Sequence, residues 1–158
     1  MHVVPPYAEK DRTPEGNRAV KKRRVDEGTN HAALVFDGDR AVAGCEDGTP
    51  EELPNIYHRK EYEAALSRLP DNRLTCFFVD KDYRRKGVAA VALRGAVDLI
   101  ARVGGGVVEA YPHDTAGKKV SASFRYNGTR KMFEDAEFTY DRPKGKSNCV
   151  MSATVAVA

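Results

Sequence analysis

The sequence predicts a mixed α/β (α+β) fold, in which a central twisted sheet is built around one strand–helix–strand unit. Residues 74–79 are apolar at both alternating sets of positions, which is typical of a central strand covered on both faces. From Ala89 the apolar residues recur at helical spacing as far as Ile100, and Gly104 is expected to end that helix. A second apolar strand follows at residues 107–111. Strand, crossover helix and strand predict two parallel neighbours in the sheet.

The N-terminal part of the chain is expected to hold one helix. Residues 1–12 are polar and contain two prolines, so we expect them to be extended or disordered. Thr13 offers a capping hydroxyl, and Pro14 fits the first helical position. The helix is therefore expected to start here and to end at Gly28.

A hairpin and a long polar segment follow this helix. The Asp-Gly-Asp sequence at residues 37–39 separates two strand-like runs, residues 32–36 and 40–44, which is a direct hairpin signal. Residues 46–72 are mostly polar, with a short helix expected at residues 61–69. A connection of this length inside a compact domain is often functional, so we expect it to form a flap on the substrate side.

The C-terminal third is expected to close the sheet with an antiparallel hairpin. Residues 112–128 are polar and predict a loop, and residues 129–136 predict a short helix. Residues 138–140 and 148–157 resemble strands, joined by a loop at residues 142–147. This hairpin completes a mixed sheet around the strand–helix–strand unit.

Composition and charge narrow the class of protein. A chain of 158 residues, 41% apolar and 31% charged, is expected to form one domain spanning residues 1–158. Its apolar runs are shorter than a membrane span and its first residues lack the pattern of a secretory signal, so we expect no membrane association and a cytoplasmic location. The net charge of +3 is too small to predict a nucleic-acid partner. Cys45, Cys76 and Cys149 are odd in number and widely spaced, which predicts reduced thiols and no metal site.

A basic turn joins the central strand to its helix. The first amides of a helix lack carbonyl partners and carry the positive end of the helix dipole. Gly87 and the small Ala89 let a bulky anion reach those amides, and Arg84, Arg85 and Lys86 add positive charge at the same place. The turn is therefore expected to bind a pyrophosphate, although its spacing is that of neither the dinucleotide nor the nucleoside triphosphate motif. The alternative is an ordinary connection with solvated basic side chains.

The turn Arg84-Arg85-Lys86-Gly87-Val88-Ala89 resembles the Q/R-x-x-G-x-G/A turn of the GNAT N-acetyltransferase superfamily. The match includes the apolar strand before the turn and the helix after it. The order of the predicted elements also resembles the family, and the resemblance to a group of bacterial GNAT proteins of mostly unassigned substrate covers about residues 14–152. Further local matches are Glu15-Gly16-Asn17-Arg18, Gly44-Cys45, Glu109-Ala110-Tyr111-Pro112 and Met132-Phe133-Glu134.

The resemblance implies that the protein transfers an acetyl group from acetyl-CoA to a primary amine by direct attack. Backbone amides of residues 85–89 are expected to hold the pyrophosphate, and main-chain groups near Val79 are expected to pair with the pantetheine arm. The Val79 amide is expected to polarise the thioester carbonyl. The expected cofactor contacts are Phe78, Val79, Arg84, Arg85, Lys86, Gly87, Val88 and Ala89.

Glu109 is the first candidate for the catalytic base, because it interrupts an apolar strand beside the expected cofactor, where burial favours proton uptake. The alternative is a strand-end carboxylate paired with a basic residue; His113 and Asp114 are weaker candidates. Many family members protonate the departing thiolate with a tyrosine in the last short helix. Phe133 occupies that place here, so Tyr126 is the remaining candidate for the catalytic acid.

A second departure concerns the start of the domain. GNAT domains begin with a strand before the first helix, but residues 1–7 are too short and proline-broken to supply one, so the sheet is expected to lack that edge strand. An uncovered edge invites pairing with another chain, so we expect a homodimer or a reduced stability.

Three functions are weighed. The favoured one is N-acetylation of a small polar amine or a peptide amine. The second is a catalytically weak or inactive acetyl-CoA sensor of the same fold, suggested by Phe133. The third is nucleic-acid binding through the basic residues 21–24 and 81–86, which is disfavoured because interleaved aromatic residues and strong overall basicity are lacking.

Overall fold

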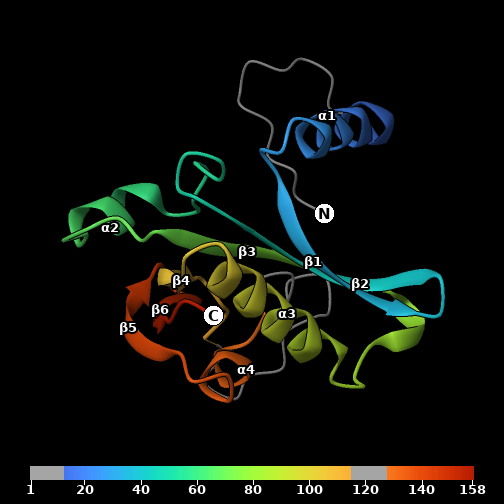
Figure 1. Cartoon of the computed structure of the whole chain (residues 1–158). Coiled ribbons are helices and arrows are strands. Elements are labelled where there is room, and N and C mark those ends of the chain that lie inside the picture. The colour runs from blue at the N-terminus through green and yellow to red at the C-terminus, as the bar shows by residue number, and fades with distance from the viewer. Residues whose placement is uncertain (1–12, 115–127) are drawn as a thin grey trace.

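A computed structural model describes residues 13–114 and 128–158 of the chain (Figure 1). Six strands form one sheet in the order β1-β2-β3-β4-β6-β5. The strands are β1 (His31–Asp37), β2 (Arg40–Gly48), β3 (Asn72–Val79), β4 (Gly106–Ala110), β5 (Thr139–Lys144) and β6 (Asn148–Val155). The helices are α1 (Pro14–Asp26), α2 (Arg59–Ala64), the 3-10 turn η1 (Lys81–Tyr83), α3 (Val88–Arg102) and α4 (Arg130–Glu134).

The predicted mixed α/β fold is confirmed. β3 and β4 are parallel and are joined by α3, whereas the other neighbouring pairs in the sheet are antiparallel. β3 lies third among the six strands, so its predicted central position is also confirmed. The C-terminal hairpin of β5 and β6 packs against β4 through β6.

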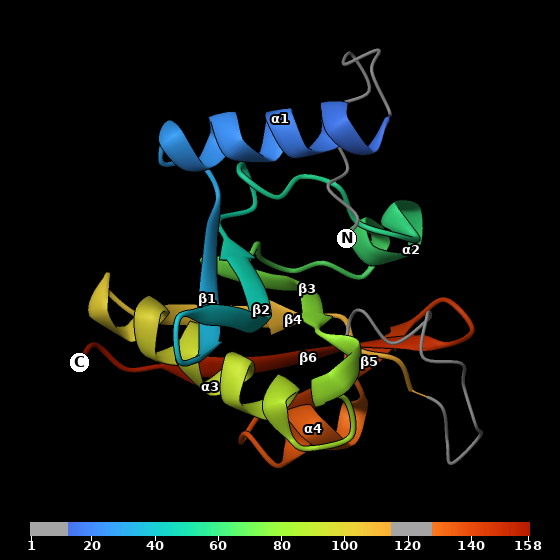
Figure 2. The ribbon, with the colours of Figure 1, turned by 90° about the vertical axis from the view of Figure 1, so that its right-hand side faces the viewer.

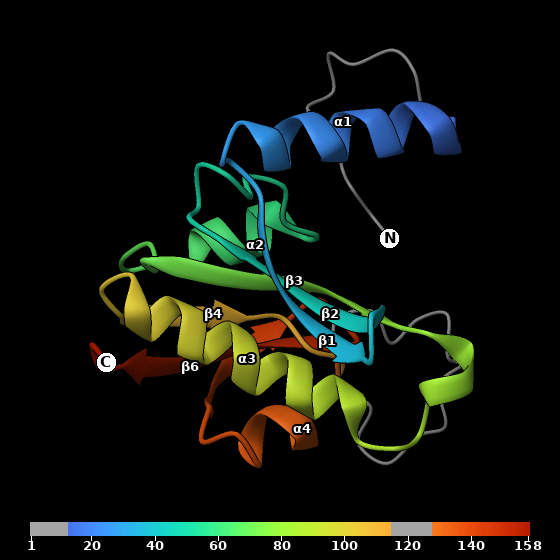
Figure 3. The ribbon, with the colours of Figure 1, turned by 45° about the vertical axis from the view of Figure 1, so that its right-hand side comes forward.

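The helices lie on both sides of this sheet. α3 and α4 cover one face, and α1 and α2 lie on the other side (Figures 2 and 3). The main core lies between the sheet and α3, where the apolar stripe of the helix meets the alternate residues of the strands. Its buried side chains include Ala92, Leu93, Ala96 and Ile100 of α3 with Leu74, Phe77, Val108, Ala110 and Met151 of the sheet.

Local signals explain where α1 and α3 begin and end. The Thr13 hydroxyl accepts a hydrogen bond from the Gly16 amide at 3.1 Å, and α1 ends at Asp26, just before Gly28 adopts a positive φ of 70°. α3 begins after Gly87 and ends at Arg102, where the glycines of residues 104–106 turn the chain towards β4. Both predicted helices are therefore confirmed to within about two residues.

Other predicted boundaries need correction. β2 continues to Gly48 and β5 to Lys144, so both hairpins are longer than expected, and Pro143 is tolerated because β5 is an edge strand. α2 ends at Ala64, five residues before its predicted end, and the chain then turns into the approach to β3. The predicted C-terminal helix is shorter, since Thr129 caps α4 with its hydroxyl, which accepts from the Met132 amide at 3.4 Å.

The prediction that the central strand is covered on both faces is wrong at Phe78. Leu74 and Phe77 are buried against α3 and α4, but the Phe78 side chain is 49% exposed. Phe78 pairs with Gly44, which pairs in turn with Leu34, and Leu34 is also exposed. The physical reason is that α1 lies at the end of the β1–β2 hairpin away from its turn, so it does not cover the sheet face opposite α3 at this point (Figure 2).

At the N-terminal side of the sheet, β1 is the outermost strand and α1 precedes it directly. In the part of the chain that the structure describes, no strand comes before α1, and residues 1–12 lie outside that part. Among the described helices, none combines the length and the apolar character needed to cross a bilayer. Cys45, Cys76 and Cys149 are buried free thiols.

Candidate active site

The basic turn after β3 is held by its own polar side chains. The Asp80 carboxylate caps η1 by accepting from the Asp82 amide at 3.0 Å, and it pairs with Arg40 of β2 at 2.6 Å. Asp80 is therefore a turn residue, and both contacts hold the pKa of its carboxyl below the ordinary range, the amide contributing most. Gly87 then takes a φ of +75°, which glycine adopts without strain, and α3 starts at the next residue.

The start of α3 is open to solvent. Arg84, Arg85, Lys86 and Gly87 are all exposed. The first helical hydrogen bond is the one from the Val91 amide to the Gly87 carbonyl at 3.4 Å, so the amides of residues 88–90 have no acceptor within the helix. A Cβ placed on Gly87 would meet no atom within 4 Å. An anion can therefore approach these amides from outside without displacing any described part of the chain.

The residues predicted to contact the cofactor run without a break from the end of β3 through the basic turn to the start of α3. β3 stays paired with β2 up to Val79, whereas its pairing with β4 covers three residue pairs and ends at Leu74 opposite Ala110. The two parallel strands therefore part after Leu74, because the chain after β4 follows β6 instead: the Pro112 carbonyl accepts from the Cys149 amide at 3.1 Å. From the parting point to Val79, β3 has an edge that the described part of β4 does not cover, and this edge leads to the basic turn.

Glu109 lies one residue before the parting point, on the face of the sheet away from α3. Its neighbours Val108 and Ala110 belong to the main core, so the side chain of Glu109 points to the opposite face. The residue is 5% exposed. Its Oε2 accepts hydrogen bonds from the Tyr62 hydroxyl at 2.7 Å and from the Tyr111 hydroxyl at 3.0 Å. Glu109 is therefore a buried carboxylate that two phenols orient.

The two phenols are themselves buried and packed edge to face, with ring centroids 5.7 Å apart. Burial raises the pKa of Tyr111 far above its ordinary value, and the Glu109 carboxylate raises it further. Burial is also the main reason why the pKa of Tyr62 is raised. Both hydroxyls therefore keep their protons at neutral pH and act as donors to Glu109.

Tyr62 reaches Glu109 because α2 is fastened across the sheet. The Arg73 guanidinium lies 5.6 Å from the centroid of the Tyr62 ring, and its Nη1 donates to the Leu53 carbonyl at 2.8 Å. At the other end, the Gly145 amide donates to the Glu61 carboxylate at 2.9 Å. The segment predicted as a flap is thus anchored on β3 and on the β5–β6 turn.

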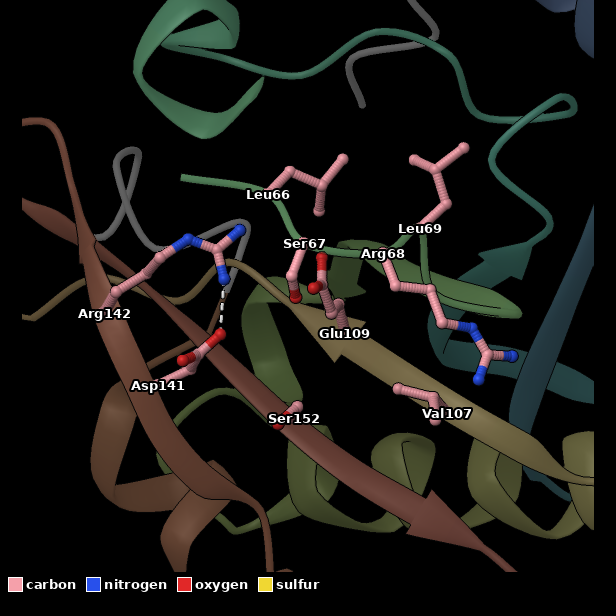
Figure 4. A pocket seen from close by; sticks show the side chains of 9 residues that line it. All are labelled: Leu66, Ser67, Arg68, Leu69, Val107, Glu109, Asp141, Arg142 and Ser152. Carbon is pink, nitrogen blue, oxygen red and sulfur yellow. Dashed lines mark hydrogen bonds and ion pairs between the residues drawn. The ribbon is translucent and has the colours of Figure 1, made fainter. Parts of the chain in front are cut away.

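A pocket of about 180 Å³ opens beside Glu109 (Figure 4). The chain between α2 and β3 forms one side of it, β4 and β6 form the floor, and β5 forms the other side. Part of the segment predicted as a flap lines this pocket, while residues 115–127 of the predicted loop lie outside the described residues. The lining side chains are Leu66, Ser67, Arg68, Leu69, Val107, Glu109, Asp141, Arg142 and Ser152.

A second buried carboxylate lies on β2, and sequence reasoning did not single it out. Glu46 forms an ion pair with Lys21 of α1 and accepts from the Asn30 amide at 2.6 Å and, at 3.5 Å, from the Thr75 hydroxyl. Glu46 is therefore held in an ion pair on β2, and it does not line the pocket beside Glu109.

The remaining candidates have structural surroundings or lie outside the described residues. Phe133 is fully buried and packs edge to face against Phe77 and Phe138, so it belongs to the core. Asp114 pairs with Arg130 at 3.1 Å, and the His113 backbone bridges to Thr129 and Asn148. Tyr126, the predicted acid, lies outside the described residues.

Sequence reasoning missed Tyr62, Tyr111 and Arg142 as neighbours of Glu109. Tyr62 stands at apolar spacing in a helix, which is the signal of a core residue, and Arg142 falls in a predicted loop. Tyr111 offered one usable signal, because residues two apart on a strand share a face with each other and therefore with Glu109.

Similarity to known proteins is found at the level of three-dimensional structure. No protein-family model matches the sequence, and no curated protein matches it either. Among solved structures, a protein assigned to the GNAT acetyltransferase family from Desulfovibrio desulfuricans superposes with a TM-score of 0.58 at 16% identity, over 91% of this chain and 84% of that one.

Two further solved structures have the same fold. An N-acetyltransferase from Staphylococcus aureus gives a TM-score of 0.56 at 12% identity, covering 95% of this chain and 82% of that chain. An acetyltransferase from Thermus thermophilus gives 0.52 at 15% identity, covering 89% and 73%. At such identities the similarity concerns the fold.

Proposed function

We propose that this chain, which has the fold of the GNAT N-acetyltransferases, transfers an acetyl group from acetyl-CoA to a primary amine. One observation carries the proposal: β3 and β4 part at Leu74 and Ala110, with the exposed start of α3 at one end of the open edge and Glu109 at the other. An extended ligand that lies between the two strands could pair with the backbone edge of β3. Its anionic end would then lie at the start of α3 and its other end near the proposed base.

The residues present fit acetyl-CoA. The open amides at the start of α3, with Arg84, Arg85 and Lys86 exposed around them, suit a pyrophosphate. The uncovered edge of β3 up to Val79 suits the amides of a pantetheine arm, which would pair with it as a neighbouring strand does.

Glu109 is proposed as the base. Bound acetyl-CoA supplies a thioester, whose C–S bond breaks as the amine nitrogen bonds to the acetyl carbon and the electron pair leaves with sulfur. Only a neutral amine attacks, so a proton must leave the incoming ammonium, and Glu109 is placed to accept it, directly or through a water. Tyr62 and Tyr111 hold Oε2, and Glu109 lines the pocket.

A catalytic acid is not essential for the departure of sulfur. An ordinary thiol has a pKa of about 8.5, so a thiolate is a tolerable leaving group near neutral pH. Phe133 supplies no proton, and Tyr126 remains the proposed donor on sequence grounds. The expected consequence is a modest penalty in rate.

The proposal is tested by measuring CoA release from acetyl-CoA over a broad panel of primary amines. We expect amine-dependent release by the wild-type protein and a loss of at least 100-fold in Glu109→Gln, in line with the typical contribution of a general base. Glu46→Gln serves as the matched control for removal of a buried carboxylate and is expected to keep acetylation activity. Equal activity of Glu109→Gln and wild type would overturn the role of Glu109.

The sensor function is kept as the second candidate because Phe133 is packed into the core where a catalytic tyrosine is expected. It predicts that acetyl-CoA stabilises the protein against heat while no amine in the panel causes CoA release. That pair of results would replace the transferase by an acetyl-CoA-binding module.

A further inference from the structure

The pocket beside Glu109 carries balanced charge. Two carboxylates, Glu109 and Asp141, and two guanidinium groups, Arg68 and Arg142, line it. The Arg68 side chain is 73% exposed at the rim, whereas that of Arg142 is 17% exposed. Figure 4 shows Arg142 and Asp141 together on β5, across the pocket from the chain between α2 and β3. The deeper part of the pocket therefore offers one base and one cation.

Arg142 is built into place but is not saturated. Its Nη1 donates to Asp141, and its guanidinium lies 5.3 Å from the centroid of the Tyr62 ring. Its Nη2 is buried and has no hydrogen-bond partner in the described part of the chain. Arg142 lines the pocket with a partly exposed side chain, and a guanidinium carries five N–H donors, so it can donate to an acceptor that enters there.

Building on the proposed transferase function, we infer that the acceptor is a small amino acid, meaning a primary amine that carries a carboxylate. The ammonium lies at Glu109, which removes its proton, while the carboxylate accepts from Arg142 at the side of the pocket. Ser152 pairs with Glu109 in the sheet and lines the floor between these positions. The same tyrosine, Tyr62, contacts both the base and the cation, so it sets their relative position.

Charge and size select this class among amines. A simple amine or diamine offers Arg142 no acceptor. A phosphate dianion is disfavoured because Asp141 already neutralises part of the Arg142 charge. A ligand group with a single negative charge therefore matches the remaining positive charge better. At about 180 Å³ the pocket is smaller than the 300–1,000 Å³ of typical drug-sized sites, which suits a molecule of amino-acid size.

The test compares amino acids with their own carboxamides. Each pair, such as glycine and glycinamide or β-alanine and β-alaninamide, keeps the amine and nearly the same shape while the negative charge is removed. CoA release is measured as kcat/KM for each partner. A charge-assisted hydrogen bond predicts a preference of roughly 10- to 100-fold for the acids. Arg142→Gln should bring the ratio close to one, and Arg142→Lys should restore only part of it, because lysine lacks the planar fork.

Arg94→Gln, on the exposed face of α3, is the matched control and should keep the wild-type ratio. Carboxamides that react as well as the acids in the wild-type protein overturn the inference and leave the transferase function standing. Calorimetric titration of the same pairs into the CoA-bound protein gives a readout that needs no turnover. Equal binding of acids and amides there, or an acid preference that survives in Arg142→Gln, also overturns the inference.

Discussion

Replacing Tyr62 by phenylalanine tests whether the two phenols prepare Glu109 for catalysis. The substitution keeps the ring that packs against Tyr111, Arg73 and Arg142, and it removes only the hydroxyl that donates to Glu109 at 2.7 Å. The fold should therefore be retained while one oriented donor to the carboxylate is lost.

The size of the effect follows from the bond that is removed. A hydrogen bond to a charged group contributes about 1.5–3 kcal/mol, and here it orients the carboxylate that acts as base. Because about 1.4 kcal/mol corresponds to a factor of ten in rate, Tyr62→Phe should lower kcat/KM by roughly 10- to 100-fold. Tyr111→Phe removes the longer bond of 3.0 Å and should lower kcat/KM by a similar or smaller factor.

The assay is CoA release with the best acceptor, followed at subsaturating acceptor so that it reports kcat/KM. Tyr57→Phe is the matched control, because Tyr57 is 76% exposed and the change removes one phenol without touching Glu109. Equal kcat/KM for Tyr62→Phe and wild type would refute the idea that these phenols prepare Glu109 for catalysis.

Three further predictions concern stability and assembly. Burial lowers the pKa of Lys144 to about 8, so the stability of the wild type should rise as pH increases from about 8 to about 10.5. Lys144→Met should abolish that rise. In urea unfolding at pH 7 this variant should be more stable than wild type by up to about 3 kcal/mol. Burial raises the pKa of Asp47 to about 6, so the free energy of unfolding should fall by up to about 3 kcal/mol as pH rises from 4 to 6. Asp47→Asn should remove this fall, so that its denaturation curves at the two pH values give the same free energy of unfolding. We expect a homodimer formed through the β1 edge, where Leu34 and Phe36 are each 57% exposed; light scattering after size exclusion should give twice the chain mass, and a monomer at all concentrations would contradict it.

The strand–turn–helix unit could be predicted from the sequence because its signals are local. The apolar run before Val79, the glycine at position 87 and the helical stripe from Ala89 each act within a few residues. The position of Glu109 also follows, since a charged residue in an apolar strand must face away from the core. The structure has the strand, turn and helix in the predicted order, and Glu109 lies on the strand that follows them.

The surroundings of Glu109 could not be predicted, because they depend on how distant segments meet. Tyr62 lies 47 positions from Glu109, and the contact forms only when α2 is fastened to the β5–β6 turn. Arg142 lies in the edge strand β5, which is predicted from the sequence as too short a strand, because a proline such as Pro143 normally argues against a strand. The exposure of Phe78 has the same origin, since apolar spacing shows that a residue can be buried but not which element covers it.

The account depends most on the open start of α3 as the site for the phosphates of acetyl-CoA. Gly87 and Gly28 form a matched pair for testing it: their φ angles are +75° and +70°, and a Cβ at either position meets no atom within 4 Å. Glutamate at either position should therefore cost a similar 1–2 kcal/mol of backbone strain. Only at position 87 would the new carboxylate crowd and repel a bound pyrophosphate.

The decisive measurement is the stabilisation of wild type, Gly87→Glu and Gly28→Glu by acetyl-CoA in thermal unfolding. Ligand at 100 times its dissociation constant should add about 2.7 kcal/mol to wild type and to Gly28→Glu, and almost nothing to Gly87→Glu at the same concentration. Equal stabilisation of all three proteins, or of none, would contradict binding of acetyl-CoA at the start of α3.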